Sequence, residues 1–313
     1  MNYNLSVLLL LSLCFFSSCK QGNKEGFKET EKLKIGVMSS MDFVPLAVAH
    51  EMGFFEKHQV KVDIRKFFSA NDRDAAFQSG NIDGTVIDYT GAILQKAGGV
   101  DLKITSSCNA TFCIMTGPNS SIRQLPDLKG RRVAVSRNTV IDFCTEMALQ
   151  SVGIGPSEIK KEEINKIPIR LEMLMSGQID ATALPDPFIT IATSRGAESI
   201  VCMKDLDYAV TGFVFKTEVI NHKNEALKGF YQAYNEAVEY IQSHSAQDLK
   251  DILVTEIGFP ETLINSVELP DYTSAQMPRD KDIQAAIDWL KSKKLIPSDF
   301  SSEDLLDNHL IKN

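Results

Sequence analysis

The chain has 313 residues, of which 43% are hydrophobic and 24% charged, a composition typical of a soluble globular protein long enough for two domains. Its formal net charge is −8 and it has no long basic run, so we do not expect it to bind nucleic acid. The 5 histidines are scattered, without the spacing of a metal site or a catalytic triad. We therefore expect neither a metal nor a cofactor.

The N-terminus has the pattern of an export signal. Leu5 to Phe16 is a nearly continuous apolar stretch, too short for a membrane-spanning helix, and small residues follow it up to Cys19. It resembles a bacterial lipoprotein signal peptide in which residues 1–18 are removed and Cys19 carries lipid. Residues 19–32 are polar and are then expected to form a flexible tether. A plain secretory signal peptide is the alternative.

The first part of the folded region alternates strand and helix patterns, which predicts parallel βαβ units. Its strand patterns cover residues 33–37, 60–67, 84–87, 102–105 and 112–116. Its helix patterns cover residues 42–53, 71–78 and 91–97. The break at Gly117-Pro118-Asn119-Ser120 is the strongest in the folded region, and we predict that the chain crosses into a second lobe there.

The second part of the folded region repeats this organisation. Its strand patterns cover residues 133–135, 179–184 and 200–203, and its helix patterns cover residues 140–150 and 167–176. A return strand at 208–215 precedes a nearly all-helical tail, which must pack on the first lobe. One face of its longest helix is apolar, with Leu227, Tyr231, Tyr234, Ala237, Val238 and Ile241. We therefore assign 33–116 and 212–313 to lobe 1 and 117–211 to lobe 2, with hinges at 116–120 and 211–215.

Two internal matches support two lobes of like topology. Lys34-Ile-Gly-Val, followed by Asp42-Phe43, parallels Arg132-Val-Ala-Val, followed by Asp142-Phe143. Downstream, Ser-Gly-Asn-Ile-Asp-Gly-Thr before Asp88 parallels Ser-Gly-Gln-Ile-Asp-Ala-Thr before Asp186. Both matches occur at a similar offset, which a repeated unit explains, although a chance likeness between βα units is the alternative.

Four cysteines remain in the exported chain: Cys108, Cys113, Cys144 and Cys202. Export permits disulfides, and Cys108 with Cys113 is the only close pair in the sequence. Buried free thiols are an equally good interpretation, so the pairing stays open at this point.

Polar and aromatic side chains follow the ends of the predicted strands, where open α/β sheets bind ligands. The candidate ligand-binding residues are Ser39, Ser40, Asp42, Phe43, Asp88, Tyr89, Thr90, Asn109, Ser136, Arg137, Asn138, Thr139, Asp186 and Phe188. Each has a structural alternative: hydroxyls and carboxylates cap helices, Arg137 can be a surface charge, and aromatic rings can belong to the core.

Several motifs in register resemble one family of solute-binding proteins. They are Pro45-Leu-Ala-Val-Ala-His-Glu-Met-Gly-Phe-Phe, the two Ser-Gly-Xaa-Ile-Asp segments, and Leu128-Lys-Gly-Arg-Arg-Val-Ala-Val. The chain is similar to the nitrate/sulfonate/taurine-binding and thiamine-pyrimidine-precursor proteins of ABC importers. The resemblance implies the α/β, two-lobed type II periplasmic-binding-protein fold with a ligand cleft between the lobes. It also implies a monomer that serves an ABC permease and its ATPase, and lipid on Cys19 would anchor this monomer to a membrane, facing the periplasm or the cell surface.

An exported enzyme is the alternative, because the family includes eukaryotic enzymes that make the thiamine pyrimidine. Those enzymes carry a Cys-rich metal segment that this chain lacks, so we expect a binding protein. Asp42, Asp88 and Asp186 are all predicted at the cleft edge, and carboxylates repel a desolvated anion but accept hydrogen bonds from amino groups. We therefore favour a pyrimidine-like or amine-bearing ligand over a sulfonate, taurine or nitrate.

Overall fold

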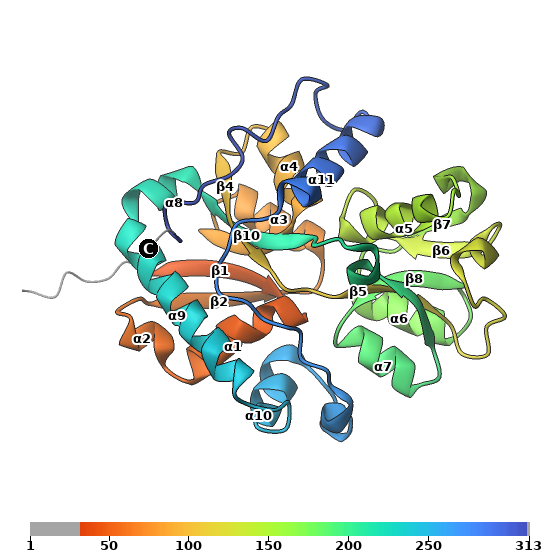
Figure 1. Cartoon of the computed structure of the whole chain (residues 1–313), viewed down its shortest axis with the longest axis horizontal. Coiled ribbons are helices and arrows are strands. Elements are labelled where there is room, and N and C mark those ends of the chain that lie inside the picture. Colours follow the sequence, from red (N-terminus) through yellow and green to blue (C-terminus); the bar gives the residue numbers. More distant parts are fainter. Residues whose placement is uncertain (1–31, 312–313) are drawn as a thin grey trace, which may run out of the picture.

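A computed structural model describes residues 32–311, and the predicted signal peptide, Cys19 and residues 19–31 of the tether lie outside the described residues. The described chain forms two α/β lobes that stand side by side (Figure 1), each built on a five-stranded sheet. None of the helices in this range is long and apolar enough to cross a membrane.

The first sheet has the order β2-β1-β3-β10-β4 and the second the order β7-β6-β8-β5-β9. The strands of lobe 1 are β1 (Leu33–Met38), β2 (Val62–Phe67), β3 (Gly84–Asp88), β4 (Leu102–Cys108) and β10 (Thr211–Lys216). The strands of lobe 2 are β5 (Phe112–Thr116), β6 (Arg132–Val135), β7 (Lys160–Glu163), β8 (Ala181–Pro185) and β9 (Glu198–Cys202).

Helices cover both sheets. The α-helices are α1 (Val44–Glu51), α2 (Phe54–Lys57), α3 (Ala70–Gln78), α4 (Tyr89–Ala97), α5 (Val140–Ser151), α6 (Ile167–Met175), α7 (Phe188–Ser194), α8 (Thr217–His222), α9 (Asn224–Gln242), α10 (Lys250–Ile252) and α11 (Asp280–Ser292). Short 3-10 or π segments are η1 (Met41–Phe43), η2 (Leu125–Leu128), η3 (Pro156–Glu158), η4 (Met203–Leu206), η5 (Leu253–Ile257) and η6 (Glu261–Ser266).

The two sheets have the same pairing pattern, which confirms the prediction of two lobes of like topology. In lobe 1, β1 pairs in parallel with β2 and β3, while β10 runs antiparallel between β3 and β4. In lobe 2, β6 pairs in parallel with β7 and β8, while β5 runs antiparallel between β8 and β9. Each sheet is therefore mixed, with an antiparallel strand in the fourth of its five positions.

The repeated Ile-Asp segments make equivalent bonds in the two lobes. The Asp83 carboxylate accepts a hydrogen bond from the Lys34 amide at 2.9 Å, and Asp180 accepts one from the Arg132 amide at 2.7 Å. Two residues after each aspartate, a threonine donates across the sheet. These bonds are Thr85 Oγ1 to the Gly36 carbonyl and Thr182 Oγ1 to the Ala134 carbonyl, both 2.9 Å. The repeat thus ties β3 to β1 in lobe 1 and β8 to β6 in lobe 2.

The first crossing between the lobes differs from the predicted one. All five residues of β5 are buried, and β5 pairs with β8 and β9 of lobe 2, so the chain crosses at residues 109–111. The break at Gly117 is a turn inside lobe 2, closed by a hydrogen bond from the Ser120 amide to the Gly117 carbonyl at 3.1 Å. The second crossing lies just before β10, at residues 207–210, because β10 pairs only within lobe 1.

The helical tail packs on lobe 1, as predicted. The six apolar residues expected on one face of the long helix are all buried in α9, which packs against α1 and α2. Phe213 of β10 meets the rings of Phe230, Tyr231 and Tyr234 of α9 edge to face, at centroid distances of 5.4 to 6.0 Å. This aromatic cluster is the centre of the lobe 1 core, since each ring removes a large apolar area from water.

A disulfide links β5 and β9 within lobe 2. Cys113 and Cys202 face each other in the register of these two strands, and they are 89 residues apart in the sequence. Cys108 and Cys144 are free and buried. Proximity in the sequence had singled out Cys108 with Cys113, but these two residues lie on strands of different lobes.

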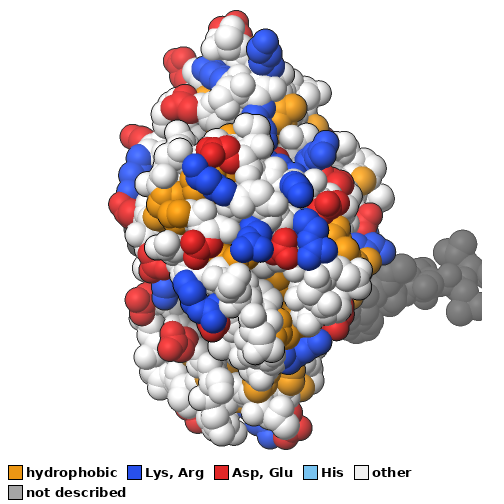
Figure 2. All heavy atoms as spheres, turned by 90° about the vertical axis from the view of Figure 1, so that its right-hand side faces the viewer, with side chains coloured by type: hydrophobic (Ala, Val, Ile, Leu, Met, Phe, Trp, Pro, Cys, Tyr) orange, Lys and Arg blue, Asp and Glu red, His pale blue; other side chains and the backbone are white. Residues whose placement is uncertain are grey.

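The outer face of lobe 2 has an intermixed charge. Figure 2 shows Lys and Arg side chains beside Asp and Glu over this face, with only small hydrophobic patches. Ion pairs of lobe 2 include Lys129 with Glu158 at 2.8 Å and Arg137 with Glu163 at 3.1 Å. Such exposed pairs contribute little to stability, and they leave no broad surface of a single charge on this face.

Candidate ligand-binding site

A cavity of about 50 Å³ lies between the two lobes, at the carboxyl ends of their strands. Lobe 1 and its adjoining crossing supply Met38, Ser40, Asp42, Ala70, Arg73, Val86, Ile87, Asp88 and Thr211. Lobe 2 supplies Phe112, Ser136, Thr139, Val140, Ile141, Asn165, Ile167, Arg170 and Pro185. The polar residues from both sides are buried, apart from the exposed Asn165, so the lobes are closed over most of the cavity in this structure.

Asp42 faces the cavity from lobe 1. It lies in η1, directly after β1, where the Ser40 hydroxyl donates a hydrogen bond to its carboxylate. Burial raises the pKa of Asp42, and the Ser40 hydrogen bond and the charge of Arg73 only partly oppose this effect. A buried carboxylate of this kind accepts hydrogen bonds readily from a ligand that carries a donor group.

Asp88, the second carboxylate on the lobe 1 side, already has partners within the protein for both of its oxygens. One oxygen caps α4 by accepting the Gly91 amide at 2.8 Å, and Thr90 donates to the same oxygen. The other oxygen pairs with the buried guanidinium of Arg73 at 3.3 Å. Arg73 is also bound to Asp74 at 2.8 Å, so one guanidinium is shared between two carboxylates. The structure therefore gives Asp88 the capping role that was its structural alternative, on the cavity wall.

The lobe 2 wall begins at the loop between β6 and α5. Ser136 donates to the side chain of Asn165 at 2.9 Å, and Thr139 caps α5 by accepting the Ile141 amide at 3.3 Å. The Thr139 hydroxyl also donates to the Ser136 carbonyl at 2.8 Å, which closes the loop on itself. The N-terminal end of α5 is thus presented to the cavity.

Arg170 is the distinctive group of the lobe 2 wall. It lies in the first turn of α6, its side chain is 1% exposed, and Nη1 donates to the Ile164 carbonyl at 2.8 Å. Its Nε and Nη2 atoms have no hydrogen-bond partner among residues 32–311. Burial lowers the pKa of Arg170 to about 10, with Glu163 acting in the opposite direction, so the group is still protonated at neutral pH.

The structure brings only part of the predicted set to the cavity: Ser40, Asp42, Asp88, Ser136 and Thr139. Ser39 is absent from the wall, Thr90 supports Asp88, and Asn109 donates to the Asp271 carbonyl at 3.1 Å. Arg137 and Asn138 are exposed. Asp186 caps α7 through the Thr190 amide at 2.9 Å and does not line the cavity.

The predicted aromatic walls are also absent. Phe43 and Tyr89 are buried in the hydrophobic core, and Phe188 packs against the core of lobe 2. The aromatic residue on the cavity wall is Phe112, the first residue of β5. It follows the crossing at residues 109–111 and belongs to lobe 2, whereas the predicted crossing at 116–120 assigns this strand to lobe 1 and away from the cleft edge.

Arg170 was missed because nothing around it in the sequence indicates a site. It follows Ile167-Pro168-Ile169 and precedes another apolar residue, so the segment reads as an ordinary amphipathic helix. One signal was available: α6 follows β7 and begins at the same sheet edge as the predicted loop 136–139. A charged residue in the first turn of such a helix is a candidate for the cleft.

The cavity wall combines hydroxyl, carboxylate and guanidinium groups. Its lining residues include no His, Cys or Lys, and the Ser40 hydroxyl is hydrogen-bonded to the Asp42 carboxylate. Over residues 32–311, no three His, Cys, Asp or Glu side chains are arranged to hold a metal ion. Burial raises the pKa of the Cys108 and Cys144 thiols well above the ordinary value, which keeps them protonated and unreactive.

Two lobes of like topology, two crossings and a cavity between them, lined by both polar and apolar side chains, define the periplasmic-binding-protein fold. The sequence pattern of the family described as "NMT1/THI5 like" matches residues 40–247, and the chain belongs to this family. A Bacillus subtilis protein provisionally named as an aliphatic sulfonates-binding protein is 23% identical, over 98% of this chain and 95% of its own length. A protein of Brachyspira hyodysenteriae provisionally named as an ABC transporter periplasmic binding protein is 21% identical, over 82% of this chain and 80% of its own.

Solved structures confirm the predicted fold. The alkanesulfonate-binding protein SsuA from Xanthomonas axonopodis pv. citri, bound to MOPS, superimposes with a TM-score of 0.73 at 18% identity, over 85% of this chain and 94% of that one. The desulfurization enzyme DSZB has the same fold, with a TM-score of 0.68 at 12% identity, over 90% of this chain and 97% of that one. The fold alone therefore does not separate a binding protein from an enzyme.

Proposed function

We propose that this protein is the solute-binding component of an ABC importer, and that the cavity between its lobes captures one small polar solute. Family membership, the fold and the names of its relatives support this role. The finer features that we propose are a lipid on Cys19, a flexible tether, and delivery of the solute by the monomer to a permease with its ATPase. A binding protein of this kind retains its ligand by closing two lobes around it.

The observation that carries the ligand assignment is the buried guanidinium of Arg170. Two of its nitrogen groups are without partners in residues 32–311 and the residue lines the cavity, so a ligand oxygen is the group that would satisfy them. A sulfonate or carboxylate suits a guanidinium best, because two of its oxygens can accept hydrogen bonds in parallel. We therefore assign an anionic head group to the lobe 2 side.

The ligand also needs a hydrogen-bond donor on the lobe 1 side. Asp42 is the one cavity carboxylate not paired with an arginine, since Asp88 is bound to Arg73 and Asp186 lies elsewhere. An amino group placed against Asp42 would satisfy it. The proposed ligand therefore has the amino group expected from the sequence and, in addition, an anionic group. An amine-bearing sulfonate or carboxylate is favoured over a purely cationic amine or a bare oxyanion.

A thermal-shift panel tests this assignment. We expect taurine to stabilise the protein more than methanesulfonate, and both to stabilise it more than nitrate, an aminopyrimidine or putrescine. Arg170→Gln should weaken taurine binding by about ten- to a hundredfold, because it removes a charge-assisted contact worth about 1.5–3 kcal/mol. Titration calorimetry measures this loss and also shows whether the ligand is bound unchanged.

The matched control is Arg195→Gln. Arg195 is another arginine of lobe 2, but it is exposed and paired with Glu172 at 2.6 Å, outside the cavity. Its replacement should leave binding unchanged. Equal binding by Arg170→Gln and the wild type would refute the anion assignment, and conversion of the ligand into a product would refute the binding-protein role itself.

A further inference from the structure

A second group of charged side chains joins the lobes outside the cavity. It consists of Asp142 and Glu146 on α5, Lys161 on β7, and Trp289 and Lys293 at the end of α11. We call these five residues the interlobe clasp. None of them lines the cavity, and the proposed ligand site uses none of them.

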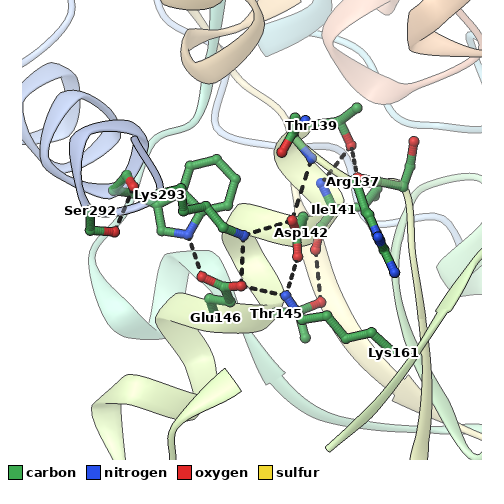
Figure 3. A network of polar contacts seen from close by, with 12 residues as sticks. Arg137, Thr139, Ile141, Asp142, Thr145, Glu146, Lys161, Ser292 and Lys293 are labelled. Carbon is green, nitrogen blue, oxygen red and sulfur yellow. Dashed lines mark hydrogen bonds and ion pairs between the residues drawn. The ribbon is translucent and has the colours of Figure 1, made fainter. Parts of the chain in front are cut away.

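Two lysines enclose the two carboxylates (Figure 3). Lys293 Nζ lies 2.9 Å from Asp142 and 2.8 Å from Glu146, and Lys161 donates to the same two carboxylates from β7. The Trp289 indole nitrogen donates to the second oxygen of Glu146 at 2.7 Å. The Lys293 ammonium also stands 4.4 Å from the centre of the Trp289 ring, in cation–π geometry.

The clasp connects opposite lobes. Asp142, Glu146 and Lys161 belong to lobe 2, whereas α11 packs against α4 of lobe 1. The contacts of Lys293 and Trp289 with the carboxylates therefore cross the interface. The Phe143 ring, between the two carboxylates on α5, meets the Trp289 ring edge to face at 5.5 Å, so an apolar contact accompanies the polar ones.

Asp142 also connects the clasp to the cavity wall. It accepts a hydrogen bond from the Asn138 amide at 3.4 Å, and Asn138 lies in the loop between Ser136 and Thr139. Both of these flanking residues line the cavity. A lysine of lobe 1 thus holds the carboxylate that supports a ligand-facing loop of lobe 2.

The charges balance only when the lobes are closed. Lobe 2 contributes two carboxylates and one lysine, and lobe 1 contributes the second lysine. The Asp142 side chain is 2% exposed and Glu146 is 10% exposed, so water reaches these carboxylates little. If the lobes separate, the contacts of Lys293 and Trp289 with the carboxylates are lost. Lys161 is then the only lysine of the clasp beside Asp142 and Glu146, and water must solvate the remaining negative charge.

We propose that the interlobe clasp holds the lobes in the closed arrangement, with or without a ligand, and so sets how long the cavity retains its solute. Lys293 and Trp289 are then positioning residues for ligand retention, because they act through lobe closure and not through contact with the solute. The closure part of the proposal rests only on the two-lobed fold. The retention part rests on the proposed solute-binding function.

Small-angle X-ray scattering of the ligand-free protein tests the closure. Lys293→Gln should have a larger radius of gyration than the wild type at low salt, and high salt should expand the wild type, because ions screen the clasp pairs. The control is Lys294→Gln: Lys294 is the next residue, is exposed, and forms no ion pair within residues 32–311. Equal radii for the wild type and Lys293→Gln would overturn the proposal.

The fluorescence of Trp289 gives a second readout, since it is the only tryptophan of the chain. It is 4% exposed in the closed arrangement, so its emission should move to longer wavelength in Lys293→Gln but not in Lys294→Gln. Circular dichroism checks that each variant is folded. If Lys293→Gln does not fold, Glu146→Gln, which keeps Lys293 on Asp142, replaces it with the same expected expansion and red shift.

Retention is tested with taurine as the probe. Lys293→Gln should release taurine about tenfold faster than Lys294→Gln, which corresponds to the loss of one charge-assisted contact. An unchanged release rate together with an unchanged radius would refute the clasp. Failure of all variants, including the wild type, to bind taurine or any other solute of the thermal-shift panel would count against the proposed function, and the scattering and fluorescence results would still decide the closure.

Discussion

The two lobes share one topology but place equivalent aspartates in opposite environments. Asp42 and Asp142 occupy matching positions in the sequence repeat, each followed by phenylalanine. Asp42 faces the cavity, and burial raises its pKa. Burial acts on Asp142 in the same direction, but hydrogen bonds from Lys161 and Lys293 outweigh it and bring the pKa of Asp142 below its ordinary value. A shared fold therefore fixes where such a residue stands but not which charges surround it.

The lobes also differ in how their sheets are secured. Lobe 1 packs the aromatic residues of α9 and the rest of the helical tail on its sheet. In lobe 2, one side of the sheet shares a large apolar cluster with lobe 1, and the other side packs in a smaller cluster, mostly aliphatic, beside the Cys113–Cys202 disulfide. The disulfide thus adds a covalent constraint beside the smaller of these two clusters.

Removal of the disulfide should have the largest effect on stability. Cys113→Ala together with Cys202→Ala should lower the free energy of unfolding by about 4 kcal/mol, because the bond closes a loop of 89 residues. Chemical denaturation measures this change, and hydrogen exchange should place the loss in lobe 2. An equal loss of protection in lobe 1 would break the comparison of the lobes. Cys144→Ala, at a free thiol of the same lobe, is the control.

The two equivalent aspartates should respond to pH with opposite sign. Asp142 has a lowered pKa, so its carboxylate stabilises the fold above the ordinary pKa of about 3.9, and this contribution is lost as the pH falls through the lowered pKa. Asp142→Asn should therefore cost about 2 kcal/mol at pH 7 and much less in acid. The groups that face Asp142 are Lys161, Lys293 and Glu146.

Asp42 is the opposite case. Its raised pKa favours the folded state below the ordinary pKa, and that contribution is lost as the pH rises through the raised pKa. Asp42→Asn should therefore make the ligand-free protein more stable at pH 7, in contrast to Asp142→Asn. Thermal unfolding between pH 3 and 8 compares the two variants. A change in stability of the same sign in both variants would show that the two aspartates have similar electrostatic environments.

The smallest expected effect concerns the repeated threonines. Thr85→Val and Thr182→Val each remove one buried hydrogen bond of 2.9 Å to the backbone of a neighbouring strand. Each should cost about 1 kcal/mol in the free energy of unfolding, and the two costs should be equal. Urea denaturation checks this expectation, with Thr255→Val, at an exposed hydroxyl outside the repeat, as the control. Unequal costs would mean that the two sheets are less alike than their pairing shows.

The fold could be predicted from sequence because its signals are local and repeated. Alternating strand and helix patterns, the two Ile-Asp segments and the apolar face of α9 each follow from spacing alone. The crossing at residues 109–111 could not be predicted this way. A strong turn at Gly117 marks a reversal of the chain, but only pairing with β8 and β9 decides to which sheet β5 belongs.

The position of the cavity could be predicted from the sequence, but only some of its lining residues could. Residues that directly follow strands, such as Asp42 and Ser136, were found because the ends of parallel strands meet at one edge. Arg170 was not found because it lies within α6, among apolar residues and not directly after a strand. Phe112 was not found because only the pairing of β5 with β8 and β9 places it in lobe 2. Asp186 was wrongly brought into the argument for the ligand, since a carboxylate after a strand serves a helix cap as readily as a ligand.

The placement of β10 has a consequence for the order in which the lobes are completed. All strands of lobe 2 lie between residues 112 and 202, so this lobe is one continuous insertion within lobe 1. The sheet of lobe 1 has a gap between β3 and β4 that only residues 211–216 fill. During synthesis, which starts at the N-terminus, lobe 2 can therefore complete its sheet first. The facing edges of β3 and β4 in lobe 1 stay unpaired until β10 and the helical tail have been synthesised.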